Sequence, residues 1–228
     1  MKLGRPRLHV REIGSTNDRA RELAAAGAPH GTLVTAGVQT AGRGRQGRTW
    51  TAPAGSSLLM SLVLRESDAL LPLRAGLAVA AIAGDTATVK WPNDVLLEGR
   101  KVAGVLAEAR PQEGWTVLGI GLNVALDVRL LPPELHAVAG TLGRLPRDIE
   151  PTLVELLRAL EEWLAAPAPA VVEALRRRDA LRGQRLEWAG GAGVGEGIDD
   201  TGALLVRRAD GSVVALEAGE VRVRAPAV

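Results

Sequence analysis

The stretch GRGRQGR, residues 42–48, narrows the choice of fold more than any other segment. Its spacing matches G-x-G-x-x-G, but the dinucleotide-binding fingerprint needs a helix directly after the glycines, and here Trp50, Pro53 and Gly55 follow. The phosphate-binding loop of nucleoside triphosphatases is excluded as well, because no Lys-Ser or Lys-Thr pair follows the last glycine. The stretch is therefore a long loop that belongs to neither of these nucleotide-binding folds.

Arginines and glycines alternate in this loop, which suits the binding of an anion. Glycines let backbone N–H groups approach an anion closely, and arginines form charge-assisted bonds with carboxylate or phosphate. The alternative is a flexible basic surface loop, which would be favoured for a loop of arbitrary sequence. The regular spacing, with Trp50 two residues further on, favours an anion-binding loop.

Hydrophobic periodicity on both sides of the loop predicts strands and helices in mixed order. Strands are expected at residues 7–13, 32–39, 57–64, 88–90, 95–97, 101–109 and 115–124, and helices at 16–26, 71–83, 153–164 and 171–181. From Gln184 onward, five short strands separated by turn signals suggest a small barrel. We therefore expect an α/β (α+β) domain over residues 1–182 and a small all-β domain over residues 183–228.

The composition is that of an ordinary globular protein, with 46% hydrophobic and 24% charged residues. The absence of cysteine excludes disulfides and thiolate metal sites. No secretory signal is visible at the start, and the longest apolar run is too short to span a bilayer. We therefore expect a cytoplasmic protein with no membrane partner.

Lysine is rare in this chain, which draws attention to the positions that keep it. Of 28 basic residues, only Lys2, Lys90 and Lys101 are lysine. Lys90 ends a strand beside Asn93 and Asp94, an arrangement that suits triphosphate oxygens and Mg²⁺, although these residues are also common in turns. Lys101 begins a strand, either as a compact mobile charge or as an ordinary surface lysine.

Two further polar segments also permit both a structural and a functional interpretation. Glycines at 119 and 121 inside a strand, followed by Asn123, indicate a close neighbour or ligand, or equally a bulge with a turn-forming Asn. Ser15, Thr16 and Asn17 form a helix cap that is able to leave one polar group facing a pocket. Gln39, at a strand end, offers both a donor and an acceptor. The histidines show no ligand spacing, and nothing resembles a hydrolase triad or a zinc site.

Taken together and in this order, these segments resemble the biotin protein ligase family. The resemblance rests on Ser15 to Asn17, Gln39, residues 42–48 with Trp50, Lys90 to Asp94, Lys101 with Gly104, and residues 119–123. Residues 197–206 are similar to part of the family's small SH3-like barrel. The resemblance implies a central mixed β-sheet flanked by helices and followed by that barrel.

The resemblance also implies an activity and its substrates. Such a ligase forms biotinyl-5′-AMP from biotin and ATP, with Mg²⁺. It then passes biotin to a specific lysine of a biotin carboxyl carrier protein, a subunit of acetyl-CoA carboxylase. Some relatives carry an N-terminal DNA-binding domain, but here the first strand begins by residue 7, so we expect no DNA partner and no repressor activity. A monomer and a homodimer are both compatible with the sequence.

The resemblance assigns roles to individual residues. Residues implied to bind biotin are Ser15, Thr16, Asn17, Gln39, Gly42, Arg43, Gly44, Arg45, Lys101 and Gly104. Residues implied to bind ATP are Arg48, Trp50, Lys90, Asn93 and Asn123, with Asp94 as a ligand of Mg²⁺. Lys101 and Arg45 are the catalytic candidates, because cations must offset the repulsion between the biotin carboxylate and ATP.

Two alternatives remain open. A lipoate ligase shares the fold type and the adenylation chemistry, but the Arg/Gly loop and the C-terminal domain favour biotin. A non-catalytic basic module that binds nucleic acid is the alternative from another class, and its binding would weaken steeply with salt. That module would lack the aromatic stacking platform expected for single strands, because the chain has no Phe and no Tyr.

Overall fold

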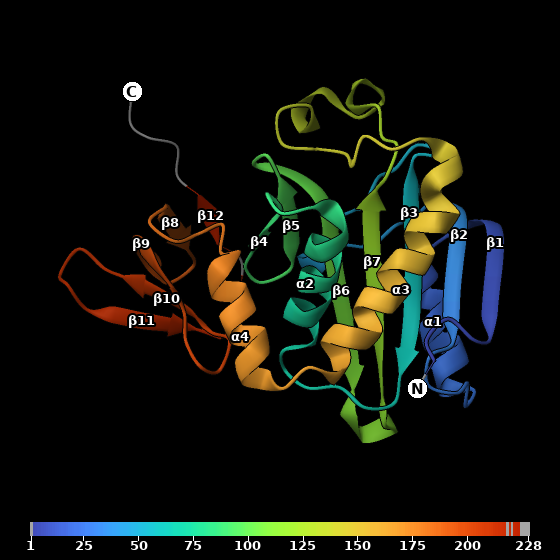
Figure 1. The fold of residues 1–228 in the computed structure, drawn as a ribbon, viewed down its shortest axis with the longest axis horizontal. Coiled ribbons are helices and arrows are strands. Elements are labelled where there is room, and N and C mark those ends of the chain that lie inside the picture. Colours follow the sequence, from blue (N-terminus) through green and yellow to red (C-terminus); the bar gives the residue numbers. More distant parts are fainter. Residues whose placement is uncertain (1, 218, 220, 224–228) are drawn as a thin grey trace.

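Seven strands form one sheet in the order β1-β2-β3-β7-β6-β5-β4 in the computed structural model, which describes residues 2–217, 219 and 221–223 (Figure 1). The strands are β1 (Arg7–Ile13), β2 (Leu33–Gln39), β3 (Ser57–Leu64), β4 (Thr88–Lys90), β5 (Asp94–Leu97), β6 (Arg100–Arg110) and β7 (Trp115–Asn123). β1 and β2 are parallel and every other pair is antiparallel. The predicted mixed sheet is therefore confirmed.

Helices cover both faces of this sheet. The helices are α1 (Thr16–Ala25), α2 (Leu71–Ala83), α3 (Ile149–Ala165) and α4 (Ala168–Arg177). On one face α2 lies over β4, β5 and β6 and α3 lies over β3, and the core on this face takes in alternate residues of β3 and β7, including Leu62 and Ile120. α1 packs on the other face against the residues between them, including Val63 and Val117. Because α1 is short, it covers only part of its face.

α4 begins earlier than its sequence pattern suggests. The pattern predicts a helix over residues 171–181, whereas α4 begins at Ala168 and ends at Arg177. The sequence pattern takes Pro167 and Pro169 as the break between two helices. Pro169 instead lies in the first turn of α4, where the missing N–H costs nothing. The neighbouring α3 likewise begins at Ile149, four residues before its predicted start, after a turn that contains Pro146.

Five short strands form a second sheet in the order β11-β10-β9-β8-β12. They are β8 (Arg185–Trp188), β9 (Gly191–Ile198), β10 (Leu204–Arg207), β11 (Val213–Leu216) and β12 (Arg222–Val223). The prediction of five strands in a small C-terminal domain is confirmed, and the barrel that they form is not closed within the described residues. β12 pairs with β8 through two residues only, and among the described residues it does not pair with β11. The sheet is therefore open along these two edges.

The second sheet is docked on the first part of the chain through side chains that reach backbone carbonyls. Trp91 Nε1 donates to the Gly202 carbonyl at 3.1 Å. Arg176 Nε donates to the Ile198 carbonyl at 2.8 Å. The predicted division after residue 182 falls in the turn between α4 and β8, and it stays a prediction. Within the described part of the chain, no helix has the length and apolar composition needed to cross a membrane.

Candidate active site

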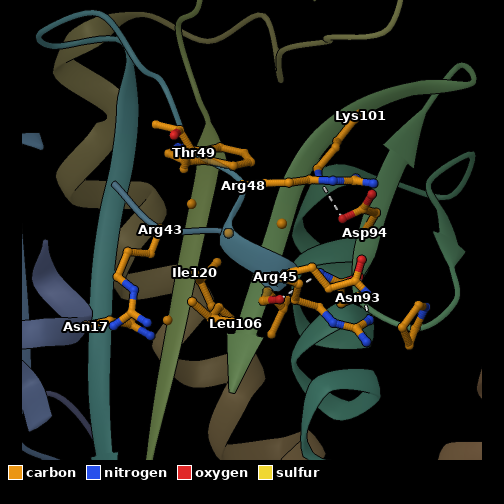
Figure 2. Close-up of a pocket in the computed structure, with 18 of the residues that line it drawn as sticks. Asn17, Arg43, Arg45, Arg48, Thr49, Asn93, Asp94, Lys101, Leu106 and Ile120 are labelled. Carbon is orange, nitrogen blue, oxygen red and sulfur yellow. Dashed lines mark hydrogen bonds and ion pairs between the residues drawn. The ribbon is translucent and has the colours of Figure 1, made fainter. Parts of the chain in front are cut away.

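A cavity lies on the α1 face of the seven-stranded sheet, beneath the loop of residues 42–48 (Figure 2). All the predicted site residues except Gly42 and Asn123 line it. Those that do are Ser15, Thr16, Asn17, Gln39, Arg43, Gly44, Arg45, Arg48, Trp50, Lys90, Asn93, Asp94, Lys101 and Gly104. Segments that are far apart in the sequence, from α1 to β6, thus meet around one space.

Two glycines of β7, Gly119 and Gly121, lie on the floor of the cavity. No larger residue would fit at either position. A Cβ atom at Gly119 would lie 2.0 Å from Asn17 Oδ1, and one at Gly121 would lie 2.4 Å from Trp50 Cε2. The close neighbours that these glycines require are therefore side chains of the protein itself. Asn17 and Trp50 are held against the sheet at two points of the cavity.

Polar side chains form one end of the cavity and bond to one another. Gln39 Oε1 accepts from the Thr16 backbone N–H at 2.7 Å and from the Thr16 hydroxyl at 3.0 Å. Ser61 Oγ, fully buried on β3, donates to Asn17 Oδ1 at 2.6 Å and lies 2.8 Å from the Thr16 hydroxyl. This chain of bonds gives Thr16, Asn17 and Gln39 fixed orientations.

At this end of the cavity, the hydroxyl of Ser15 has no hydrogen-bond partner within the described chain. Ser15 stands at the N-cap position of α1, but its hydroxyl makes no cap hydrogen bond. The residue is 3% exposed, and its Oγ has no hydrogen-bond partner within the described chain. Because buried polar groups normally have a partner, a hydroxyl in this state on a cavity wall indicates a polar ligand.

The loop of residues 42–48 is closed by its own backbone. Trp50 N–H donates to the Gly42 carbonyl at 2.9 Å, and Gly44 N–H donates to the Arg48 carbonyl at 2.7 Å. Gly42 lies outside the cavity lining, and a Cβ atom there would lie 2.4 Å from the Trp50 carbonyl oxygen. The missing side chain of Gly42 therefore allows the two ends of the loop, at Gly42 and Trp50, to come together.

The arginines of the loop reach toward opposite ends of the cavity (Figure 2). Arg43 lies near Asn17 and pairs with Asp18 at 2.7 Å. Arg45 donates to Asn93 Oδ1 at 3.2 Å and to the carbonyl of Gly219 at 3.1 Å. Burial lowers the pKa of Arg45, partly offset by the charge of Asp94.

The other end of the cavity carries an excess of positive charge. Lys101 Nζ lies 2.7 Å from Asp94 Oδ1 and 5.6 Å from the centre of the Trp50 ring. Burial lowers the pKa of Lys90, and the nearby charge of Asp94 opposes this shift. Among the described residues of the lining, the basic side chains at this end, Arg45, Arg48, Lys90 and Lys101, outnumber the carboxylates, of which there is Asp94 alone. Such an excess in a recess attracts anions.

Asn123 lies away from this space. It is 5% exposed and does not line the cavity. Its Nδ2 donates to the Gly140 carbonyl at 2.9 Å, and its Oδ1 accepts from the Ser57 hydroxyl at 3.2 Å. The structure therefore gives its amide a role in holding the end of β7, and its predicted contact with ATP stays a prediction.

Several residues at the site escape the sequence analysis. Ser61 and Glu108 bond to Asn17, and Gly219 and Val221 of the C-terminal part line the cavity. Strand alternation offered a signal for Glu108, since residues 106 and 108 lie on the same face of β6 as Gly104. The other three carry no local signal, because only the tertiary fold brings them to this place.

Comparison with known proteins agrees with this geometry. The sequence profile of the Biotin/lipoate A/B protein ligase family matches residues 10–125. The profile of the Biotin protein ligase C terminal domain matches residues 193–224. Together these matches include the loop, the polar wall, the strands of the cavity floor and most of the second sheet.

Individual relatives and structures point the same way. The biotin–[acetyl-CoA-carboxylase] ligase of Mycobacterium tuberculosis is 37% identical over 93% of this chain and 86% of that protein. A bifunctional ligase/repressor of Bacillus spizizenii is 40% identical over 62% of this chain and 47% of that protein, so the chain spans about half the length of that relative. The structure of biotin protein ligase from Aquifex aeolicus in complex with biotin and ATP superposes with a TM-score of 0.83 at 28% identity, over 96% of this chain and 99% of that chain. The chain therefore belongs to the Biotin/lipoate A/B protein ligase family, and within it to the biotin protein ligases.

Proposed function

We propose that the protein is an ATP-dependent biotin protein ligase. It forms biotinyl-5′-AMP from biotin and ATP and then transfers biotin to a specific lysine of a biotin carboxyl carrier protein, a subunit of acetyl-CoA carboxylase. The observation that carries the proposal is the polarity of the cavity. One end has a buried Ser15 hydroxyl without a partner in the described chain, and the other end has an excess of cations. Biotin matches this, since it carries a polar ureido ring at one end and a carboxylate at the other.

At the polar end, Ser15, Thr16, Asn17 and Gln39 bind the ureido ring. The Ser15 hydroxyl gains the partner that it lacks, and the bonds from Gln39 to Thr16 hold the wall in place. Leu106, on the same face of β6 as Gly104, lines the middle of the cavity, where it contacts the apolar thiophane ring and valeryl chain. This orientation directs the carboxylate toward the arginine loop and Lys101.

In the first step, a carboxylate oxygen of biotin attacks the α-phosphorus of ATP, and pyrophosphate leaves. The two reactants are both anions, so their approach requires fixed positive charge. Lys101 and Arg45 supply this charge at the end of the cavity away from Asn17 (Figure 2). Because these groups are held by Asp94 and Asn93 before the substrates meet, little reorganisation is needed.

The phosphates of ATP are bound by Arg48, Lys90 and Asn93. The adenine ring packs against Trp50. Mg²⁺ usually keeps several waters and binds one or two carboxylates together with substrate phosphates. Asp94 fits this pattern as a single ligand, while the described residues contain no cluster of three or more His, Cys, Asp or Glu that could hold a metal by itself. When bound with ATP, Mg²⁺ would offset the charge of the departing pyrophosphate.

In the second step, the amine of the carrier lysine attacks the activated carbonyl carbon, and AMP leaves with the electrons of the broken C–O bond. Lys101 stabilises the charge on the departing phosphate. Until then, the closed loop keeps water away from the mixed anhydride. Because ATP and the carrier are the substrates, we place the reaction in the cytoplasm.

Direct detection of the intermediate tests this function. The protein is incubated with biotin, ATP and Mg²⁺, and bound biotinyl-5′-AMP is sought by mass spectrometry under non-denaturing conditions. A parallel incubation with lipoate distinguishes the related activity. An adenylate formed from lipoate and not from biotin would transfer the proposal to that substrate.

The lowered pKa of Lys90 predicts a pH dependence of ATP binding. Lys90 is charged below its pKa and loses its proton at a lower pH than an ordinary lysine, whose pKa is about 10.4. The KM for ATP should therefore begin to rise at a lower alkaline pH than the titration of an ordinary lysine would cause. The Lys90→Arg variant keeps its charge throughout this range, so its KM profile should stay flatter. Profiles of the same shape for both proteins would assign the titration to another group.

Gly121→Ala should displace the Trp50 indole from the cavity floor, because the new methyl group would lie 2.4 Å from Cε2. Overpacking of this kind costs about 1–3 kcal/mol, so the KM for ATP should rise by roughly tenfold. Biotin binding, measured by calorimetry without ATP, should change much less. Gly14→Ala is the matched control, since a Cβ atom there meets nothing within 4 Å. An equal effect of both substitutions would argue against a nucleotide role for Trp50.

A further inference from the structure

Glu108 connects the polar wall of the cavity with the arginine loop. It lies on β6, its side chain is 18% exposed, and it does not line the cavity itself. Its Oε2 accepts from Asn17 Nδ2 at 2.8 Å. Its Oε1 lies 3.2 Å from Arg43 Nη2 and 3.4 Å from Arg21 Nη1. One carboxylate therefore touches a residue from each half of the proposed biotin site.

The contact with Asn17 decides which way its amide points. An Asn side chain has nearly the same shape in both orientations, so its partners set the positions of oxygen and nitrogen. A carboxylate only accepts hydrogen bonds, so Glu108 requires Nδ2 on its side and leaves Oδ1 facing the Ser61 hydroxyl. Asn17 Oδ1 occupies the space that a side chain at Gly119 would fill, 2.0 Å from the position of a Cβ atom there. Glu108 thereby fixes one end of the bonds that run through Ser61 to Thr16.

The contact with Arg43 ties the first half of the loop to the same wall. Arg43 also pairs with Asp18 at 2.7 Å, so two carboxylates from different elements, α1 and β6, hold one guanidinium. Arg21 lies near both of these carboxylates and balances their charge. The position of Arg43 at the biotin end therefore depends on Glu108 as well as on the loop itself (Figure 2).

We propose that Glu108 is a positioning residue for biotin, which orients Asn17 and Arg43 through one carboxylate without contacting the substrate. The proposal rests on the ligase function given above. It predicts that a change at Glu108 affects the biotin half of the site and leaves the ATP half, which is held by Asp94 and Asn93, largely intact. A residue that merely stabilises the fold would not produce this division.

Glu108→Gln is the first test, because it removes the charge and keeps the shape. A glutamine that turns its oxygen to Asn17 offers its NH₂ to Arg43, so it cannot satisfy both partners. We expect the KM for biotin to rise about tenfold, while the KM for ATP stays within about twofold. Glu155→Gln is the matched control, since it removes a carboxylate paired with Arg144 at 2.7 Å on α3, across the sheet from the cavity.

Exchanging the amide of Asn17 and the carboxylate of Glu108 tests whether the orientation of the Asn17 side chain matters, or only the charge of Glu108. Asn17→Asp places two carboxylates at the position of a 2.8 Å contact, and it should raise the KM for biotin strongly. In the double variant Asn17→Asp/Glu108→Gln, the NH₂ group of the new glutamine faces the new carboxylate on α1 and restores a donor–acceptor pair. The double variant should therefore bind biotin more tightly than Asn17→Asp alone, and thermal unfolding of all variants shows whether each one folds.

The outcomes distinguish this inference from the function on which it rests. If the unmodified protein forms no adenylate from biotin, the proposed function fails. If it does and Glu108→Gln leaves the KM for biotin unchanged, or raises both KM values equally, only the role of Glu108 fails. Should Glu108→Gln not fold, Glu108→Asp takes its place. It keeps the charge but withdraws it from Asn17, so it should also raise the KM for biotin alone.

Discussion

Replacing Lys101 with alanine should slow the formation of biotinyl-5′-AMP in a single turnover by about 10²- to 10³-fold, the usual cost of losing one fixed group that stabilises transition-state charge. The Lys101 ammonium is 2.7 Å from Asp94 and lies 5.6 Å from the centre of the Trp50 ring, so it is held at the end of the cavity where we propose that the carboxylate and the α-phosphate meet. The measurement is rapid-quench detection of the adenylate with enzyme in excess over biotin.

Lys2→Ala is the matched control for this experiment, because Lys2 is exposed at the start of the chain. Lys101→Arg should also be slow, since a planar guanidinium does not replace a compact ammonium in this position. Thermal unfolding should show that both Lys101 variants fold. A single-turnover rate near that of the unmodified protein would remove Lys101 from the reaction.

Replacing Arg45 with glycine should release the adenylate into solution. The variant loses the bonds from Arg45 to Asn93 and to the Gly219 carbonyl, and glycine also loosens the loop. Hydrogen bonds from a charged group contribute about 1.5–3 kcal/mol each, so dissociation of the adenylate should become at least roughly tenfold faster. Dissociation is measured by passing the preformed complex through a desalting column and quantifying retained adenylate over time.

The control for Arg45→Gly is the same substitution at Arg129, whose side chain is 84% exposed in a surface turn. That variant should retain the adenylate as long as the unmodified protein does. Equal retention by Arg45→Gly would show that the loop does not close over the intermediate. A carrier-independent rise in the labelling of added lysine-rich peptides would provide a second sign of release.

Local patterns in the sequence located most of the strands, and the family resemblance implied the mixed sheet and most of the residues that line the cavity. Alternation identified β1, and an apolar run identified β3. The glycines of β7 indicated a close neighbour or ligand, or equally a bulge, and the structure shows that the neighbours are Asn17 and Trp50. Pattern reasoning misplaced α4, because Pro169 was treated as a break and not as a first-turn residue. Turn signals located the five short strands of the second sheet. They do not encode register or strand length, so they did not predict that β11 and β12 stay unpaired within the described residues.

The site residues that were missed are those whose role depends on distant contacts. Ser61 is one polar residue in an apolar strand, and only the packing of α1 across it reveals its bond to Asn17. Gly219 contributes a backbone carbonyl, which is identical in every residue type and so leaves no trace in the sequence. Asn123 shows the reverse case, a residue that was predicted to lie at the site but does not line the cavity. It ends β7, and its amide bonds to Ser57 and Gly140.

The bond between Arg45 and the Gly219 carbonyl joins residues that are 174 positions apart in the chain. A ribosome makes the arginine loop early and the carbonyl that anchors it late. A nascent chain therefore carries the loop, the polar wall and Lys101 for most of its synthesis without this anchor. The order of translation thus leaves this anchor of the arginine loop to one of the last residues made.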